Sequence, residues 1–183
     1  LSIYLNSSFV FNNILLAENY LSLGDYKNSK VIYSKFNSKN KIYNWYAKKR
    51  IVFIKDKIEG EESAIKFLNK NFNKLKNPTT ENYYDTGNFY RDFKKYKKSI
   101  EYYTRALNNI NRDHSLYPEI LYRRGMSYER LKMWKKSEDD LMESLRLVPN
   151  EPYVLNYLAY SWLERNINID KSIEMLEIAI ESK

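Results

Sequence analysis

The stretch LYRRGMSYERLKMWKKSEDDLMESLRLVP, residues 121–149, decides the fold class of this chain. Two of its small residues, Gly125 and Ser137, stand twelve positions apart with a Leu-Lys-Met turn at 131–133 between them. Apolar residues before the turn recur with a helical period rather than in strict alternation. The stretch therefore predicts two helices that are joined by a tight turn.

The same pair of small residues recurs along the whole chain. In each of five units a first small or β-branched anchor is followed, 12 or 13 positions later, by a second small anchor. The second anchors are 35, 35, 38 and 35 residues apart, so the two series keep one register. A period of this length predicts a stack of helical hairpins. The anchor pairs are Ala17 with Ser29, Val52 with Ala64, Gly87 with Ser99, Gly125 with Ser137, and Ala159 with Ser172.

Small anchors have a physical reason in such a stack. Two antiparallel helices joined by a tight turn approach most closely at two levels, where only a small residue keeps their axes together. Bulky residues then fill the flanks, as at Tyr90 and Tyr103, and Lys55 is the one departure from this pattern. Turn signals stand between the anchors of each unit, at 23–25, 59–61, 91–93, 131–133 and 166–168.

Composition agrees with an all-α protein. The 183 residues are 43% hydrophobic and include 18 Tyr, which is enough for a core of one-domain size. Only 4 Gly and 4 Pro leave too few turn residues for a barrel or a sandwich. The lack of Cys excludes disulfides and thiolate sites, and a single His excludes a histidine metal cluster. No apolar run approaches the roughly 18 residues that a membrane-spanning helix needs.

These anchors carry a family resemblance. The unit with Leu121, Gly125, Tyr128, Trp134 and Ser137 resembles a tetratricopeptide repeat (TPR), and the units around Ala17, Gly87 and Ala159 are similar to it. The unit of Val52 and Ala64 departs from the family at Lys55 and Asn71. The run 118–180 also resembles the C-terminal repeats of exported proteobacterial TPR proteins. The resemblance implies a right-handed α-solenoid of about five hairpins, with about ten helices and a partial one at the N-terminal end.

The repeat register predicts one array over residues 1–183. Residues 1–9 are expected to be the tail of a preceding repeat, and neither end shows a polar capping face, so we expect a fragment of a longer bacterial chain. The compartment stays open between the periplasm or cell envelope and the cytoplasm. The expected repeats are 10–43, 45–78, 80–113, 118–151 and 152–183.

A solenoid lines its concave side with the first helix of every hairpin, and this groove is the predicted binding site for a protein or peptide segment. Aromatic side chains mixed with Arg, Asn and Met suit peptide capture. The chaperone-binding TPR subclass needs an Asn where Phe53 stands and another where Asp85 stands, so its carboxylate ligand is not expected here. The predicted groove residues are Tyr46, Lys49, Phe53, Tyr84, Asn88, Arg91, Tyr122, Met126, Arg130, Tyr153, Asn156 and Tyr160.

Uneven charge leaves a second function open. Residues 1–79 hold 14 basic and 6 acidic residues, whereas residues 118–183 hold 10 basic and 12 acidic residues. A basic N-terminal half is compatible with RNA, an acidic protein or an anionic lipid, although no nucleic-acid motif accompanies it. The lysine run at 94–98 is interpreted as an exposed turn of a lysine-rich chain.

No motif in the sequence indicates catalysis, a cofactor or a metal. His114 lacks a nucleophile and oxyanion donors, so it is interpreted as a solvated loop residue. The consecutive carboxylates Glu138, Asp139 and Asp140 point in different directions on a helix and cannot converge on one ion. Closely spaced glycines for a phosphate loop are missing. We therefore expect a non-enzymatic scaffold, or alternatively a regulatory array attached to a catalytic domain outside this sequence.

Overall fold

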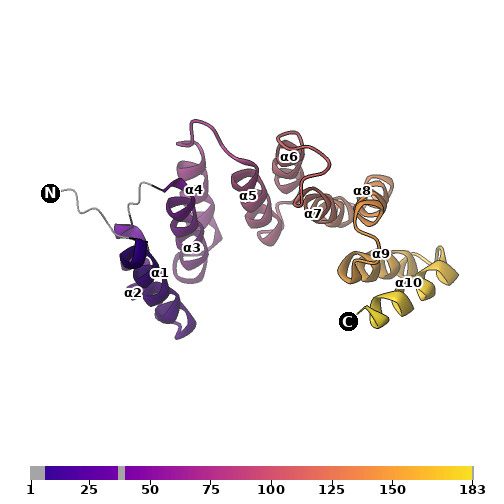
Figure 1. The fold of residues 1–183 in the computed structure, drawn as a ribbon, viewed down its shortest axis with the longest axis horizontal. Helices are drawn as coiled ribbons and strands as arrows, with labels where there is room; N and C mark the ends of the chain where they lie inside the picture. Colours follow the sequence, from indigo (N-terminus) through magenta and orange to yellow (C-terminus); the bar gives the residue numbers. More distant parts are fainter. Residues whose placement is uncertain (1–6, 37–39, 183) are drawn as a thin grey trace. The chain divides into compact units, whose positions relative to one another are not determined.

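The computed structural model describes residues 7–36 and 40–182. These residues form ten α-helices and no strand, which confirms the predicted all-α class (Figure 1). The helices are α1 (Ser7–Ser22), α2 (Tyr26–Lys35), α3 (Lys41–Glu59), α4 (Glu61–Phe72), α5 (Thr80–Asp92), α6 (Tyr96–Leu107), α7 (Tyr117–Arg130), α8 (Trp134–Leu147), α9 (Pro152–Glu164) and α10 (Ile169–Glu181).

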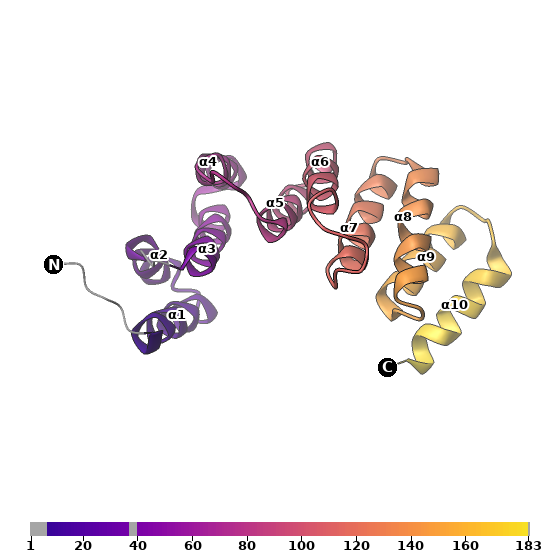
Figure 2. The same cartoon turned by 45° about the horizontal axis from the view of Figure 1, so that its top comes forward.

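Consecutive helices pair into five hairpins, so each hairpin has a first and a second helix. Helix α1 packs on α2, α3 on α4, α5 on α6, α7 on α8 and α9 on α10. Both ribbon views show α7 beside α8 and α9 beside α10 (Figures 1 and 2). The chain turns between paired helices within a residue or two of every position that the sequence predicted. None of the described helices is long and apolar enough to cross a bilayer.

All ten anchor residues are buried, as the sequence argument requires. The close approach is clearest at two glycines. A Cβ added at Gly87 would lie 2.6 Å from Cε1 of Tyr103, and one added at Gly125 would lie 3.0 Å from Cγ of Leu141. The paired helices therefore contact each other at the anchors. A Cβ at Gly87 would clash with the Tyr103 ring, and one at Gly125 would require Leu141 to move by a few tenths of an ångström.

Large side chains fill the space beside the anchors. Tyr33, Leu68, Tyr103 and Leu141 follow the second anchor by four positions, and each is 0 or 1% exposed. Lys55, the departure from the pattern, is not a core residue. Its ammonium group donates to Glu59 and to Ser63 Oγ and lies 5.9 Å from the ring centroid of Phe67.

The tight turns use the left-handed backbone region, where glycine is favoured. Gly24 adopts a φ of 75° between α1 and α2, and Asn166 adopts 55° between α9 and α10. Two lysines take the same role, since Lys94 has a φ of 55° and Lys132 a φ of 58°. A side chain with a Cβ is strained there, so the two lysine turns cost stability that a glycine would not.

The contacts divide the chain into two compact units, Leu1–Asn77 and Pro78–Lys183, which are called unit 1 and unit 2 below. The core of unit 1 gathers Ala17, Leu21, Tyr33, Ala47, Ile51 and Ile54. Unit 2 has one cluster around Tyr103 and Ile120 and another around Leu141 and Leu158.

Three helices begin earlier than the expected repeat boundaries. Helix α1 starts at Ser7, so residues 7–9 belong to the first hairpin rather than to the tail of a preceding repeat; residues 1–6 lie outside the described part. Helix α3 starts at Lys41, four residues before the expected position 45, because the side chain of Asn40 accepts the N–H of Ile42 at 2.9 Å and caps the helix. Helix α7 starts at Tyr117, one residue early.

Candidate protein-binding face

All twelve predicted groove residues lie on first helices, namely α3 in unit 1 and α5, α7 and α9 in unit 2. The surface that these first helices form in each unit is called the first-helix face of that unit. The side chains on it divide into two groups. Some are engaged in contacts between neighbouring helices, and others are exposed to solvent.

In unit 1, Tyr46 belongs to a hydrogen-bonded cluster around Glu18. Its hydroxyl donates to Glu18 at 2.9 Å, and Tyr33 donates to the same carboxylate. Arg50 donates to both carboxylate oxygens, with Nε at 2.7 Å. Burial alone would raise the pKa of Glu18, but hydrogen bonds from Arg50, Tyr33 and Tyr46 outweigh it and lower that pKa. The cluster fixes α1, α2 and α3 to one another, so Tyr46 has a structural role.

Phe53 is the more available aromatic residue of unit 1. Its ring lies 5.4 Å from the Lys57 ammonium and 5.9 Å from the Arg50 guanidinium carbon. One edge meets Tyr26 at 6.5 Å between ring centroids. Lys49, one turn earlier on α3, is half-buried. The Phe53 ring therefore lies between two cations, Arg50 and Lys57.

In unit 2, polar contacts connect α5 to α7. The hydroxyl of Tyr84 donates to Glu119 Oε1 at 2.9 Å, and Nε of Arg123 donates to the same oxygen at 2.6 Å. The Arg123 guanidinium carbon also lies 5.1 Å from the ring centroid of Tyr122. Burial, followed by the charge of Glu119, raises the pKa of Tyr84, so its proton stays in place as the donor.

A similar set of contacts connects α7 to α9. The rings of Tyr122 and Tyr157 meet edge to face at 6.0 Å, and the Tyr157 hydroxyl donates to Glu129 Oε2 at 2.8 Å. Nε of Arg130 lies 3.5 Å from the same carboxylate oxygen of Glu129. Tyr122 is buried within this set. Tyr84 and Tyr122 therefore hold the first helices together, which makes the face a rigid platform.

Three further predicted residues are turned partly inward. Asn88 accepts the hydroxyl of Tyr103 at 2.7 Å, and Met126 packs against the cluster around Leu141. Arg91 pairs with Asp92 at 2.8 Å through Nη2, while its Nη1 is buried without a hydrogen-bond partner in the described structure. These side chains shape the face more than they project from it.

The exposed group lies on α9. Tyr153, Asn156 and Tyr160 stand at i, i+3 and i+7 and so share one face of the helix. Tyr153 is 71% exposed and Tyr160 is 59% exposed, and the two residues are separated by roughly 10 Å of helix rise. Arg130 is exposed on α7. Tyr153, Tyr160 and Arg130 are the predicted residues of unit 2 that are exposed to solvent, whereas Asn156 is half-buried.

Sequence reasoning did not single out Glu119, Arg123, Glu129 and Tyr157, which organise the face of unit 2. Glu119 and Arg123 are an i,i+4 pair and could have been found from that spacing. Tyr84 and Glu119 are 35 residues apart, which is one repeat length. The offset between Tyr157 and Glu129 is 28 residues, which is not one repeat length.

The features dismissed from the sequence have local partners. Glu138 accepts from Arg165 at 2.6 Å, Asp139 pairs with Lys135 at 2.8 Å, and Asp140 accepts from Arg124, so the three carboxylates diverge as expected. His114 is exposed, and its Nδ1 accepts the Leu116 N–H at 3.1 Å. Within residues 7–36 and 40–182, no cluster of His, Cys, Asp or Glu is arranged to hold a metal ion.

Helical hairpins that repeat along the chain with small buried anchors define the class of helical repeat proteins. The comparisons with known proteins agree with this class. The family model for the tetratricopeptide repeat matches residues 80–111, and the helical hairpins of the chain have the fold of solved TPR proteins. The TPR fold serves protein–protein interaction scaffolds in general, and the coarse prediction of such a scaffold is therefore supported.

Solved structures resemble the whole array at low sequence identity. A crystal structure of MamA is 18% identical, with a TM-score of 0.65, and covers 90% of this chain and 92% of its own. The pilF protein of Pseudomonas aeruginosa is 16% identical, with a TM-score of 0.69, and covers 95% and 76%. MamA from Desulfovibrio magneticus RS-1 is 13% identical, with a TM-score of 0.69, and covers 97% and 96%. No curated protein matches the sequence.

Proposed function

We propose that this chain is a non-enzymatic scaffold that binds a peptide or protein segment along the first-helix face of unit 2. The observation that carries the proposal is the row of Tyr153, Asn156 and Tyr160 on α9, with both tyrosines exposed. An exposed tyrosine offers a rigid aromatic ring with a polar end, and such residues are frequent hot spots in interfaces.

The contacts beneath this row support the proposal. Tyr157 lies on the same helix and is held by Glu129 and by the ring of Tyr122, so α9 is fixed against α7. Binding of a partner to Tyr153 and Tyr160 therefore costs little conformational entropy in α9, because this helix is already ordered. Preorganisation of this kind raises affinity because the ordering cost of binding is smaller.

The test uses peptides selected against the full chain from a displayed random library. We expect the selected peptides to bind with a dissociation constant that rises by about tenfold or more when Tyr153→Ala and Tyr160→Ala are combined, because each hot-spot aromatic contributes at least about 1 kcal/mol. Isothermal titration measures the constant.

The matched control is Tyr43→Ala, which removes an exposed tyrosine from α3 in unit 1. Peptide affinity should not change in this variant. The proposal fails if the selected peptides bind the Tyr153/Tyr160 double variant as tightly as the parent chain, or if selection returns no binder.

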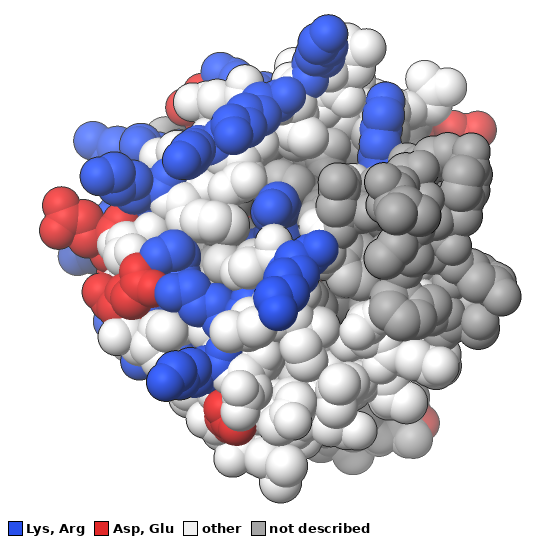
Figure 3. All heavy atoms as spheres, turned by 90° about the vertical axis from the view of Figure 1, so that its left-hand side faces the viewer, with Lys and Arg blue, Asp and Glu red and all other residues white. Residues whose placement is uncertain are grey.

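A second candidate function rests on unit 1, which we propose as an anion-binding surface. Lys66, Lys70 and Lys74 stand at i, i+4 and i+8 on α4 and just beyond its end, and all three are exposed. Like charges at this spacing destabilise a helix by a few tenths of a kcal/mol per pair, so helix stability does not favour them. Figure 3 shows a face on which Lys and Arg side chains gather, with few Asp and Glu side chains among them.

Salt dependence separates this candidate from peptide capture. A single-stranded RNA oligonucleotide that contacts the three lysines should lose about 2 from its log–log salt slope when Lys66, Lys70 and Lys74 are all changed to Glu, at roughly 0.7 per phosphate contact. Fluorescence anisotropy at several salt concentrations measures the slope. An equal slope in the triple variant, or no RNA binding at low salt, rules RNA out as the anion.

A further inference from the structure

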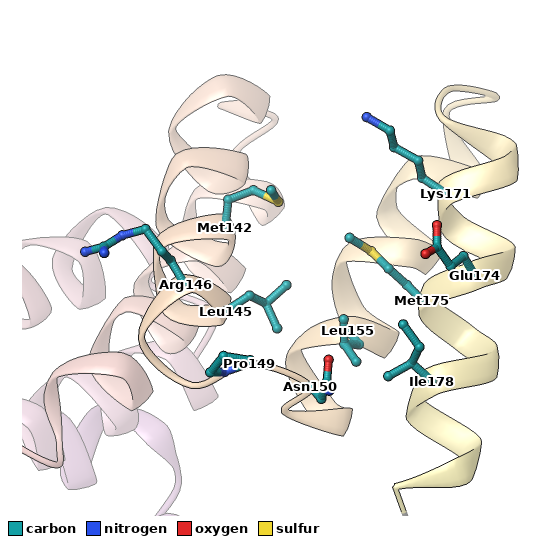
Figure 4. Close-up of a pocket in the computed structure, with 10 residues that line it drawn as sticks. All are labelled: Met142, Leu145, Arg146, Pro149, Asn150, Leu155, Lys171, Glu174, Met175 and Ile178. Carbon is teal, nitrogen blue, oxygen red and sulfur yellow. The ribbon is translucent and has the colours of Figure 1, made fainter.

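A second surface of unit 2 is hollowed between the second helices α8 and α10. The hollow has a volume of about 460 Å³, and its floor is formed by Leu155 of α9 and by the Pro149–Asn150 linker (Figure 4). Apolar side chains point into it from both helices in the close-up view. This groove, called the α8–α10 groove below, is lined on its apolar part by Met142, Leu145, Leu155, Met175 and Ile178.

The preceding junction, between α6 and α8, is bridged by polar side chains. Arg124 donates to Thr104 Oγ1 on α6 at 3.1 Å and to both oxygens of Asp140 on α8 at 2.7 and 2.8 Å. Glu143 on α8 also pairs with Arg112. The chain therefore fills this junction with its own hydrogen-bonded groups.

The same positions are apolar at the α8–α10 groove. When the repeats are aligned on their anchors, four polar residues of the α6–α8 junction correspond to apolar residues one unit later, whereas Arg112 corresponds to Asn150. The correspondence pairs Thr104 with Met142, Arg124 with Leu158, Asp140 with Met175, and Glu143 with Ile178. Leu158 is fully buried in the cluster around Leu141, and Met175 of α10 packs against the same cluster without a polar contact. The groove therefore has an apolar lining without the polar bridge of the earlier junction.

The rim of the groove carries two cations, Arg146 and Lys171, and one carboxylate, Glu174 (Figure 4). Lys171 has no salt-bridge partner in the described part of the chain, and Figure 4 shows its side chain on the rim. Its counterpart one repeat earlier, Lys136, lies 5.7 Å from the ring centroid of Tyr128. The other rim cation, Arg146, is held by Glu143 at 2.8 Å. Lys171 is the rim cation that is left to meet an external carboxylate.

We propose that the α8–α10 groove binds a short amphipathic helix of a partner protein, which inserts two or three large apolar side chains and sets a carboxylate against Lys171. The groove is open, since Met142 is 47% exposed, and an open groove between two helices suits a third helix better than a small molecule that requires enclosure. Two methionines give the lining an adaptable shape. Because α8 and α10 are second helices, this site is separate from the first-helix face.

Methionine methyl NMR of the full chain tests the proposal, because the chain has only 4 Met. Met142 and Met175 line the groove, Met126 reports on the first-helix face, and Met133 lies in the turn before α8. The probe is a designed helical peptide of about 14 residues, or about 21 Å, with leucines at i, i+3 and i+7 and a glutamate beside them. We expect its titration to shift the Met142 and Met175 methyl signals and to leave Met126 and Met133 in place.

Two further comparisons sharpen the result. The peptide should bind about tenfold or more weakly to Met142→Lys, which places a charge in the apolar lining, and with unchanged affinity to the matched control Met133→Lys. A second peptide with lysine in place of the glutamate should bind more weakly than the first to the parent chain, and this difference should vanish in Lys171→Gln.

The outcomes that overturn the proposal are distinct from those that overturn the proposed function. A shift of Met126 alone places the peptide on the first-helix face and refutes binding in the α8–α10 groove. Shifts of Met142 and Met175 that appear on concentrating the protein alone show that a second copy of the chain is the occupant, which also refutes it. The absence of any methyl shift up to millimolar peptide refutes it as well.

Discussion

Replacing Gly87 with alanine should destabilise the protein although alanine is the better helix former. The added Cβ would lie 2.6 Å from Cε1 and 2.7 Å from Cδ1 of Tyr103. That ring has no free space to move into, because Tyr103 is fully buried and its hydroxyl donates to Asn88 at 2.7 Å. Either the ring or the axis of α5 must shift.

The magnitude follows from two opposing effects. Helix propensity favours alanine over glycine by about 1 kcal/mol in a helix interior. Overpacking of a buried aromatic ring costs about 1–3 kcal/mol. Because the clash is with ring carbons at well below contact distance, we expect the upper part of that range and a net loss of about 1–2 kcal/mol in the free energy of unfolding.

The matched comparison is Gly125→Ala. Here the nearest atoms are Cγ and Cδ2 of Leu141 at 3.0 and 3.1 Å, and an aliphatic side chain adjusts by a few tenths of an ångström more readily than a tyrosine ring. The two effects should nearly cancel, so this variant should unfold close to the parent chain.

Urea unfolding followed by far-UV circular dichroism measures both variants. In Gly87→Ala, the further change Tyr103→Leu should recover part of the loss, because leucine stands at the same position in the hairpin of Gly125. If Gly87→Ala proves as stable as Gly125→Ala or more stable, the close approach of α5 and α6 at this anchor is wrong.

Three other predictions concern polar contacts and one strained turn. Glu18→Gln should cost about 1–3 kcal/mol because Arg50 loses its charged acceptor. The pKa of Glu18 is lower in the folded chain than its ordinary value of about 4.3, so the contribution of this carboxylate to the free energy of unfolding is complete above that pH and is lost on acidification. The free energy of unfolding of the variant should therefore change less with pH on the acid side. Lys132→Gly should stabilise by roughly 0.5–1 kcal/mol, since a φ of 58° strains lysine; an unchanged thermal midpoint would count against this. Asp140→Ala should cost about 3–5 kcal/mol by leaving Arg124 unpaired, whereas combining it with Arg124→Met should recover most of that loss in the same unfolding assay.

The hairpins could be predicted because their determinants are local and periodic. A small residue at Gly125 and another at Ser137 fix the pairing of α7 with α8 whatever surrounds them, and the residues at 131–133 mark where the chain must turn. Helix starts were harder. Helix α3 begins at Lys41, four residues before the position that the repeat length indicated, because the Asn40 cap depends on one side-chain hydrogen bond and not on the period.

The first-helix face could be predicted from the sequence only in part, for a different reason. Register places Tyr84, Tyr122, Tyr153 and Tyr160 alike on first helices, but it does not say which hydroxyl finds an acceptor on the next hairpin. Tyr84 meets Glu119, whereas Tyr153 extends into solvent. That difference depends on contacts between repeats, and a single-repeat pattern carries no information about them.

The lining of the α8–α10 groove shares no position with the anchors that hold the hairpins together. Met142 lies between the packed residues of α8 and is 47% exposed, so its polarity can change while Ser137 and Ser172 stay small. Substitutions at such positions can therefore convert a junction that is bridged by polar side chains into an open apolar groove, or the reverse, with little effect on folding. In a tandem architecture, each seam is free to acquire its own specificity while the framework stays constant.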